Sequence, residues 1–159
     1  MVKIKFAKMS VRAVIPTKRK EDAGYDVYAD VIEPIVIYPG QTSLIPTSIC
    51  SVIPDGYCMI LKERGSTGVR GIGQRSGVID SGFRGEWKVP ITNHSNKTLV
   101  IGPRQEDAEY VTYYGTDKAI CQALLVPVPE SCVEEVSLQE ILSTQSERMQ
   151  GEFGSTNKK

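Results

Sequence analysis

No run of apolar residues in this chain of 159 residues reaches the roughly 18–20 residues that a membrane-spanning helix requires. An excess of charge of one sign is also lacking, because 19 basic residues balance 19 acidic residues. Nothing therefore indicates a general binder of nucleic acids or of membrane surfaces. Residues 1–6 alternate in the manner of a strand and lack the apolar core of a signal peptide, so we expect a cytoplasmic protein.

Metal-binding patterns are equally scarce. The chain has one histidine, and its four cysteines, at positions 50, 58, 121 and 132, form no C-x-x-C pair. The usual zinc sites are therefore excluded, and we expect the cysteines to be reduced thiols without disulfide bonds.

Helical periodicity is missing from most of the chain. Short β-rich runs alternate instead with proline, glycine and Asx residues, which predicts an all-β sandwich or barrel. These runs are residues 35–38, 43–52, 57–61, 86–92, 98–101 and 119–128. A capping box at residues 137–140 predicts one short helix near the end of the chain. We therefore predict one β-barrel domain over residues 1–145 and a flexible C-terminal arm over residues 146–159.

The stretch of residues 77–86 combines two β-branched residues, an acid and a turn. Val78 and Ile79 lead into Asp80, the turn residues Ser81 and Gly82 follow, and residues 87–92 lead away as a strand. This pattern predicts a β-hairpin with Asp80 near its bend. Beside the ring of Phe83, that carboxylate could orient a water molecule next to a ligand. The alternative is an ordinary turn in which the acid accepts hydrogen bonds from backbone N–H groups.

Glycine and arginine alternate just before this stretch. Residues 64–77 contain five glycines, including Gly65 and Gly77, and three arginines, including Arg64. Repeated glycine lets backbone N–H groups face one point, and arginine supplies forked donors, so a phosphate cradle is one interpretation. A flexible surface loop is the other.

Two further polar positions invite a ligand. Asp26 follows an Ala-Gly step that permits close approach of the backbone, and its carboxylate suits Mg²⁺ shared with substrate phosphates. The alternative for Asp26 is a solvated acid at the start of a strand. Gln122 interrupts an apolar strand, so its amide must face solvent or make specific hydrogen bonds.

The C-terminal arm offers groups that suit a nucleotide. Arg148 could clamp a phosphate, Phe153 could stack on a base, and the arm then supplies backbone and hydroxyl donors. Those donors are Gly154, Ser155 and Thr156.

Taken in chain order, these pieces resemble the five motifs of the homotrimeric dUTPase family. The matching segments are residues 23–26, 63–67, 77–85, 119–122 and 148–156. They cover nearly the whole chain in the order that the family has. The resemblance implies a distorted jelly-roll-like β-barrel, assembly as a homotrimer with shared active sites, and Mg²⁺-dependent hydrolysis of dUTP to dUMP and pyrophosphate.

The resemblance also implies residue roles. Asp80 would activate the water that attacks the α-phosphorus, and the ring of Phe83 would lie against the deoxyribose and exclude a 2′-hydroxyl. Asp26 would hold Mg²⁺, through water. The main chain from Gln74 to Ile79, Gly77 and Val78 included, would bind the uracil edge. The phosphate oxygens would be positioned by Arg64, Gly65, Ser66 and Gln122. The arm, from Arg148 to Thr156, would close over the ligand.

This chain departs from the family pattern in five places. Phe83 stands where the family more often has a tyrosine, and Met149, Glu152 and Asn157 replace glycines of the fifth motif. Gly65 stands where the second motif has a serine, and Ser66 could take its role. In the fourth motif, Asp117 and Lys118 lie one residue out of register relative to Gln122. The chain also carries an extra segment of about a dozen residues near 102–114, whose role the sequence leaves open.

Two other functions stay open at this point. A dCTP deaminase shares the fold, but it uses a glutamate as its proton shuttle and lacks the arm motif. A nucleotide-sensing interaction protein could keep the site and act through a partner.

Overall fold

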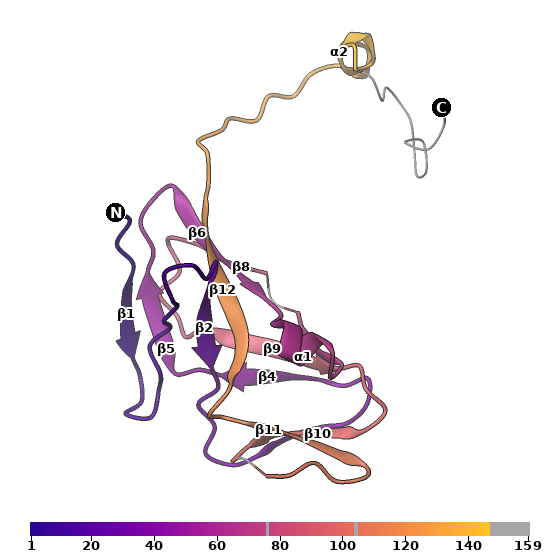
Figure 1. Cartoon of the computed structure of the whole chain (residues 1–159). Helices are drawn as coiled ribbons and strands as arrows, with labels where there is room; N and C mark the ends of the chain where they lie inside the picture. Colours follow the sequence, from indigo (N-terminus) through magenta and orange to yellow (C-terminus); the bar gives the residue numbers. More distant parts are fainter. Residues whose placement is uncertain (76, 104, 147–159) are drawn as a thin grey trace. The chain divides into compact units, whose positions relative to one another are not determined.

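The computed structural model describes residues 1–75, 77–103 and 105–146. The chain divides into two compact units, Met1–Pro129 and Glu130–Lys159. In its described residues, the first unit contains twelve strands in four sheets and a single helical turn (Figure 1). The predicted all-β fold is confirmed. The predicted division after residue 145 stays a prediction.

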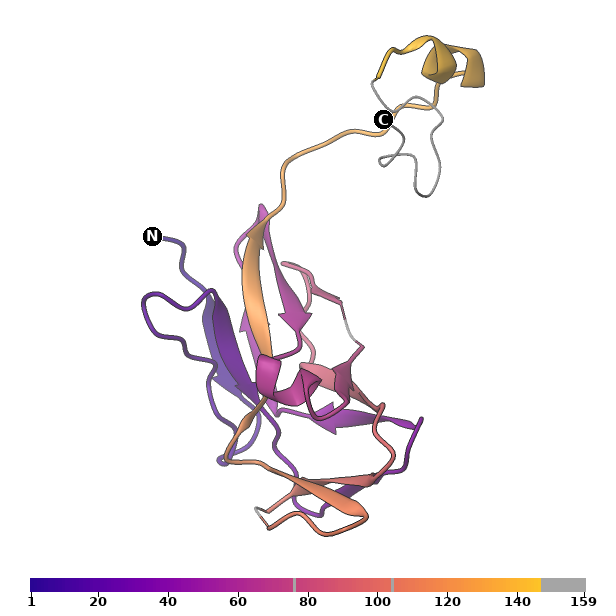
Figure 2. The same cartoon turned by 45° about the vertical axis from the view of Figure 1, so that its right-hand side comes forward.

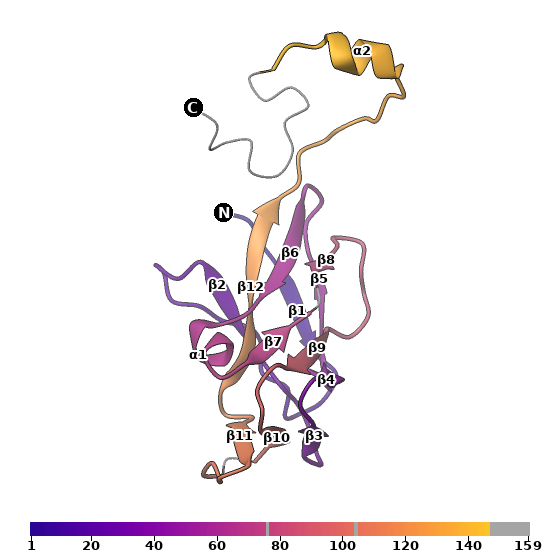
Figure 3. The ribbon, with the colours of Figure 1, turned by 90° about the vertical axis from the view of Figure 1, so that its right-hand side faces the viewer.

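The largest sheet contains four antiparallel strands in the order β2-β12-β6-β8. These strands are β2 (Gly24–Tyr28), β12 (Ala119–Pro127), β6 (Tyr57–Lys62) and β8 (Val78–Ile79). The apolar run of β12 suits a strand with a partner on each side, and β12 lies between β2 and β6 (Figure 3). The strand β8 forms one edge of this sheet.

The other three sheets are smaller. One has the order β4-β9-β7, with β4 (Thr42–Pro46), β9 (Lys88–Asn93) and β7 (Ile72–Gln74). Another has the order β11-β10-β3, with β11 (Val111–Gly115), β10 (Thr98–Gly102) and β3 (Ile35–Ile37). The last pairs β1 (Lys5–Lys8) with β5 (Ile49–Val52), and these two strands run side by side (Figure 2).

The predicted hairpin at residues 77–92 is wrong. The strand β8 pairs with β6, whereas β9 pairs with β4 and β7. The turn signal at Ser81 and Gly82 is real, because the N–H of Phe83 donates to the carbonyl of Asp80 at 3.1 Å. The chain leaves this turn without returning along β8, since Trp87 continues into the other sheet.

The predicted single run at residues 43–52 is two strands, β4 and β5. Between them Ser48 has a φ of 51°, a conformation that ends regular pairing. Its N–H donates to the carboxylate of Glu86 at 2.9 Å, and the hydroxyl of Thr47 donates to the carbonyl of Trp87. The residues between β4 and β5 therefore hold Glu86 and Trp87, which follow the Asp80 turn, by hydrogen bonds.

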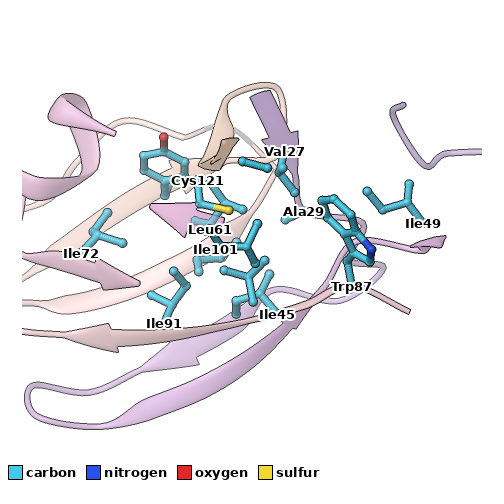
Figure 4. Packing of buried hydrophobic residues seen from close by; sticks show 14 of the residues in the cluster. Val27, Ala29, Ile45, Ile49, Leu61, Ile72, Trp87, Ile91, Ile101 and Cys121 are labelled. Carbon is cyan, nitrogen blue, oxygen red and sulfur yellow. The ribbon is translucent and has the colours of Figure 1, made fainter. Parts of the chain in front are cut away.

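Trp87 anchors one side of the hydrophobic core. Its side chain is fully buried, its Nε1 donates to the hydroxyl of Ser51 at 3.1 Å, and the ring of Phe6 meets it edge-on at 5.3 Å. Apolar side chains from several sheets complete this core, as Figure 4 shows. They include Val27, Ile45, Leu61, Ile91, Ile101 and Cys121. A rigid core of this kind holds the loops that carry polar residues in fixed positions.

Two helices are present in the described residues. The turn α1 (Gly65–Gly68) follows β6, and α2 (Leu138–Ser143) lies in the second unit. The predicted helix near the end of the chain is confirmed, since the hydroxyl of Ser137 accepts from the N–H of Glu140 at 3.1 Å. No helix in the described part of the chain is long and apolar enough to cross a membrane. All four cysteines are free, as predicted.

Candidate active site

A polar pocket of about 600 Å³ opens at one end of the largest sheet. It collects side chains from the first, second and fourth sequence motifs. Its lining residues are Thr17, Lys18, Arg19, Asp22, Ala23, Gly24, Asp26, Arg64 and Gln122. Three of the predicted site residues, Asp26, Arg64 and Gln122, are therefore neighbours, although they are far apart in the sequence.

Strand register brings Asp26 and Gln122 together. Gln122 lies opposite Asp26 on β2 and opposite Lys62 on β6. The pairing of β12 with β2 is irregular just before this point, because Ala119 pairs with Tyr28 and Cys121 with Val27. One extra residue, Ile120, is accommodated as a β-bulge. Regular pairing of β12 with β2 resumes at Cys121, so Gln122 lies opposite Asp26.

Arg64 links the pocket walls. Its Nε lies 3.2 Å from the Oδ1 of Asp26, and its Nη1 donates to the carbonyl of Ala119 at 3.3 Å. About a third of each charged side chain is exposed, so a ligand can reach this pair. The amide of Gln122 donates to the carbonyl of Glu63 at 2.8 Å, which confirms that it makes a specific hydrogen bond.

Gly24 permits the closeness of these groups. A Cβ atom at this position would lie 2.5 Å from the Oε1 of Gln122. The predicted close backbone approach at the Ala-Gly step is confirmed, and its physical reason is the space that the Gln122 side chain occupies.

The second motif forms a hydrogen-bonded turn. Arg64 is extended and precedes α1, and the hydroxyl of Thr67 accepts from the N–H of Arg64 and donates to its carbonyl. Gly65 and Ser66 are exposed on this turn.

Two glycines of the same stretch serve packing. A Cβ at Gly71 would lie 2.9 Å from the backbone nitrogen of Ser95, and one at Gly73 would lie 2.6 Å from the ring of His94. These two glycines therefore make room for residues 94 and 95, whereas a Cβ at Gly65, Gly68 or Gly77 would meet nothing within 4 Å.

Three pocket residues before the first motif escaped the sequence analysis. Lys18 donates from Nζ to the carbonyl of Asp22 at 2.6 Å, and Arg19 forms an ion pair with the carboxylate of Asp22 at 2.9 Å. Thr17 lies beside them in the pocket wall. The signal was available, since three consecutive basic residues, Lys18 to Lys20, directly precede the acids of this motif.

Asp80 lies on an exposed turn. Among the described residues, none donates a hydrogen bond to its carboxylate. The alternative in which this acid caps backbone N–H groups is therefore wrong. Arg84 holds the turn instead, because its guanidinium donates to the carbonyls of Ser81 and Phe83 at 2.5 and 2.9 Å.

The ring of Phe83 is 42% exposed and folds over Gly85. A Cβ at Gly85 would lie 2.6 Å from the Cζ of Phe83, so the glycine makes room for the ring. An aromatic side chain is thus exposed next to the Asp80 turn, and its contact with a ligand stays a prediction.

Gln74 and the pair Val78 and Ile79 lie on the edge strands of two different sheets. Gln74 is buried and ends β7, which is the edge of its sheet. The carbonyl of Gly77 accepts from the N–H of Leu61 at 3.0 Å. Val78 and Ile79 pair with β6 on one side only. Edge strands present backbone donors and acceptors on their outer side, where a flat base can bind.

Asp80 and the pocket are well separated within one chain. Ile79 pairs with Met59, which lies three residues before Lys62 in the row shared with Gln122 and Asp26. Strand spacing and rise place Ile79 about 17 Å from Asp26, and Asp80 lies one residue further from that row. One chain therefore does not bring its Asp80 to its own Asp26.

The predicted residues of the arm, Arg148, Phe153, Gly154, Ser155 and Thr156, lie outside the described residues. In the part of the chain that is described, no group of three or more His, Cys, Asp or Glu side chains could hold a metal ion. A metal at Asp26 would therefore need oxygen ligands from water or substrate.

An all-β domain with a carboxylate, a guanidinium and an amide in one polar pocket is of the class that binds phosphate-bearing ligands. A family model for dUTPase matches residues 12–157. The chain belongs to the dUTPase family. Among its relatives is a deoxyuridine 5'-triphosphate nucleotidohydrolase of Nautilia profundicola, 34% identical over 161 residues, which cover 99% of this chain and 100% of the relative. The enzyme of the same name from Candida albicans is 34% identical over 151 residues, or 94% of this chain and 84% of the relative.

Solved structures share the fold. A mutant dUTPase of Staphylococcus bacteriophage 80alpha with dUpNHpp superimposes with a TM-score of 0.77 at 24% identity, over 97% of this chain and 98% of the other. A mutant dUTPase from phage phi11 of S. aureus, with a structural Mg(II) ion, gives a TM-score of 0.70 at 23% identity, over 87% and 99%. The predicted jelly-roll-like fold is confirmed by these likenesses.

Proposed function

We propose that the chain hydrolyses dUTP to dUMP and pyrophosphate, which limits uracil in DNA and supplies dUMP for dTMP synthesis. The observation that carries this proposal is the convergence of Asp26, Arg64 and Gln122 in one polar pocket of a dUTPase-family fold. Relatives that cover the whole chain carry the name deoxyuridine 5'-triphosphate nucleotidohydrolase.

Asp80 is the proposed general base. Its carboxylate takes a proton from a water molecule whose oxygen forms a bond to the α-phosphorus, while the bond from that phosphorus to the α,β-bridging oxygen breaks. Pyrophosphate leaves with that oxygen, and dUMP remains. The exposed carboxylate, without a hydrogen-bond donor among the described residues, supports this role. General base catalysis of this kind contributes roughly 10²–10⁴-fold to a rate.

Nucleoside selection is assigned to the segment around Asp80, residues 77–86, which we name the Asp80 ribbon, and to the backbone just before it. The ring of Phe83 lies against the deoxyribose and leaves no space for a 2′-hydroxyl. The outer backbone edge from Gln74 through Gly77, Val78 and Ile79 binds the uracil edge. The position of β7 and β8 at sheet edges supports this assignment.

Phosphate binding is assigned to the pocket. Arg64 presents a guanidinium, and Ser66 with Gly65 presents a hydroxyl and backbone on the same turn. Gln122 completes the set. Asp26 holds Mg²⁺ through water, which fits a site with one carboxylate, because Mg²⁺ keeps several waters and shares substrate phosphates. When bound, the ion neutralises charge on the leaving pyrophosphate.

The separation of about 17 Å between the two regions supports a shared site. In the proposed homotrimer, the pocket of one chain faces the Asp80 ribbon of another. The arm would close over the ligand through Arg148, Phe153, Gly154, Ser155 and Thr156. A chain ending at Ser146 is expected to remain trimeric and to lose most of its turnover.

The direct test is incubation of the protein with each dNTP and Mg²⁺. We expect pyrophosphate from dUTP alone. Release of ammonia from dCTP would identify a deaminase instead, and absence of pyrophosphate from dUTP would overturn the proposal.

Mixing two inactive variants tests the shared site. Asp80→Asn keeps the pocket intact, and Arg64→Ala keeps the ribbon intact. The two variants are refolded together in equal amounts. If chains assemble at random into a closed ring, roughly one quarter of the sites combine an intact pocket from one chain with an intact ribbon from another. We expect the refolded mixture to have roughly one quarter of the wild-type activity. The control is a mixture of the two variants that were folded separately. Absence of recovery after joint refolding would show that each site lies within one chain.

A further inference from the structure

The strand β11 (Val111–Gly115) begins near the end of the extra segment around residues 102–114. It runs parallel to β10 at the edge of a sheet. An edge strand leaves backbone groups unpaired, and here two side chains cover them. Asp107 accepts from the N–H of Tyr113 at 2.8 Å, and Arg70 donates to the carbonyl of Tyr113 at 3.4 Å. Arg70 and Asp107 also form an ion pair at 2.5 Å.

Tyr114 is the inward residue of this strand. Because side chains alternate along a strand, Tyr114 points to the face opposite Tyr113, and it is buried at 2% exposure. Its hydroxyl donates to the carbonyl of Ala119 at 2.7 Å. The guanidinium of Arg70 lies 6.0 Å from the centre of its ring. The strand β11 therefore carries a fixed hydroxyl to β12.

The carbonyl of Ala119 is the meeting point of the extra segment and the pocket. It accepts from Tyr114 and also from the Nη1 of Arg64 at 3.3 Å. The β-bulge at Ile120 interrupts the strand ladder beside this carbonyl, which favours side-chain donors there. On its other side Arg64 meets Asp26. The guanidinium is thus held between two fixed oxygens.

The surroundings of the hydroxyl agree with this arrangement. Burial raises the pKa of Tyr114, while the neighbouring Arg64 and Ser66 side chains act in the opposite direction. The hydroxyl therefore keeps its proton at neutral pH, lies beside the side chains of Arg64 and Ser66, and remains a donor.

We propose that Tyr114 is a positioning residue for Arg64, so that the extra segment fixes the orientation in which the guanidinium meets the substrate phosphates. This inference rests on the proposed function. Small displacements of a forked donor weaken bidentate contacts to phosphate, so the hydroxyl acts on binding of the triphosphate and not on the nucleoside.

Tyr114→Phe removes only the hydroxyl, and Tyr113→Phe on the same strand is the matched control. We expect Tyr114→Phe to raise KM for dUTP about fivefold, with kcat within about twofold, and to leave inhibition by deoxyuridine unchanged, since deoxyuridine has no phosphate. Tyr113→Phe should match the wild type. An equal rise of KM in both variants, or equally weakened deoxyuridine inhibition, would overturn the proposal.

A double-mutant cycle separates this role from a structural one. In an Arg64→Lys background, Tyr114→Phe should change KM by less than about twofold, because the guanidinium that it orients is gone. Additive effects would contradict the proposal. Melting temperatures of all variants accompany these measurements.

Asp107→Asn provides a second route, since it loosens β11 at an exposed side chain. A smaller rise of KM, with kcat unchanged, is expected. If Tyr114→Phe fails to fold, an unchanged KM in Asp107→Asn overturns the inference.

Wild-type hydrolysis is measured first. Should dUTP not be hydrolysed, the proposed function fails, and calorimetry with inorganic triphosphate and Mg²⁺ then tests Tyr114, with fivefold weaker binding expected and unchanged binding contradicting the inference.

Discussion

The acidic side chains of the pocket have charged partners, whereas the carboxylate of the Asp80 ribbon has none among the described residues. In the pocket Asp26 meets Arg64, and Asp22 meets Arg19. On the ribbon the Asp80 carboxylate receives no hydrogen bond from the described residues. Ion-paired side chains are oriented before a ligand arrives, whereas an unpaired carboxylate in solvent can accept a proton from a water molecule. The difference supports the proposal that the phosphates bind in the pocket, whereas the catalytic base and the nucleoside contacts lie on the ribbon.

Asp80→Asn should have the largest effect of any single change. We expect kcat to fall by roughly three orders of magnitude or more, within the range that loss of a general base produces, because the amide cannot accept the proton. Binding of dUTP, measured by calorimetry, should persist because the pocket is untouched. Asp55→Asn, at another exposed turn, is the control and should be fully active. Full activity of Asp80→Asn would contradict the assignment of the general base to the Asp80 ribbon.

Gly24→Ala attacks the pocket and spares the ribbon. The new methyl group would lie 2.5 Å from the Oε1 of Gln122, so the amide must move. A displacement of about 1 Å at such a site can cost about 10²-fold in kcat/KM, and we expect a loss of that order.

Gly68→Ala provides the comparison, since a Cβ there meets nothing within 4 Å. Its kcat/KM should remain near that of the wild type. Inhibition by deoxyuridine should be the same for both glycine variants, because the proposed nucleoside contacts lie on the ribbon. Weaker deoxyuridine inhibition in Gly24→Ala would show that the two regions are not independent.

Sequence patterns predicted residues better than they predicted partners. The motif order led to Asp26, Arg64 and Gln122, and the pocket brings these together. The hairpin at residues 77–92 was wrong because turn residues report local geometry, whereas the choice of β6 as the partner of β8 depends on packing far along the chain.

The bulge and the extra segment show the same limit. The one-residue shift before Gln122 was visible in the sequence, but the β-bulge at Ile120 was not, because it depends on the pairing of β12 with β2. The covered edge of β11 and the contact of Tyr114 with the Ala119 carbonyl required three-dimensional neighbours that no local pattern specifies. The basic run from Lys18 to Lys20, in contrast, could have been found by its charge alone.

Lys18→Met extends the comparison to the basic run. The ammonium group lines the pocket, so its removal should weaken attraction of the triphosphate and raise KM by about threefold to tenfold, with little change in kcat. The effect should shrink as salt is added, because screening weakens exposed charges. Lys20→Met, whose side chain is not part of this pocket, is the matched control. Equal effects of the two variants would indicate general steering and not a pocket contact.

The smallest effect concerns stability and separates a pocket acid from a structural one. Asp26 is partly exposed, so Asp26→Asn should change the free energy of unfolding by less than about 1 kcal/mol. Asp30 is buried and bonded to Arg12 at 2.9 Å, and Asp30→Asn should cost about 2 kcal/mol at neutral pH.

Acid titration of stability sharpens this contrast. Burial acts to raise the pKa of Asp30, but the hydroxyls of Ser10 and Ser48 and the guanidinium of Arg12 hold it below its usual value. A lowered pKa in the folded state means that the unfolded chain binds the proton more readily. The stabilisation by Asp30 is therefore complete above the ordinary carboxyl pKa and is lost as the pH falls below it. Urea unfolding from pH 7 down to pH 3 should show the difference between wild type and Asp30→Asn shrinking, whereas a constant difference would mean that the Asp30 charge does not stabilise the fold.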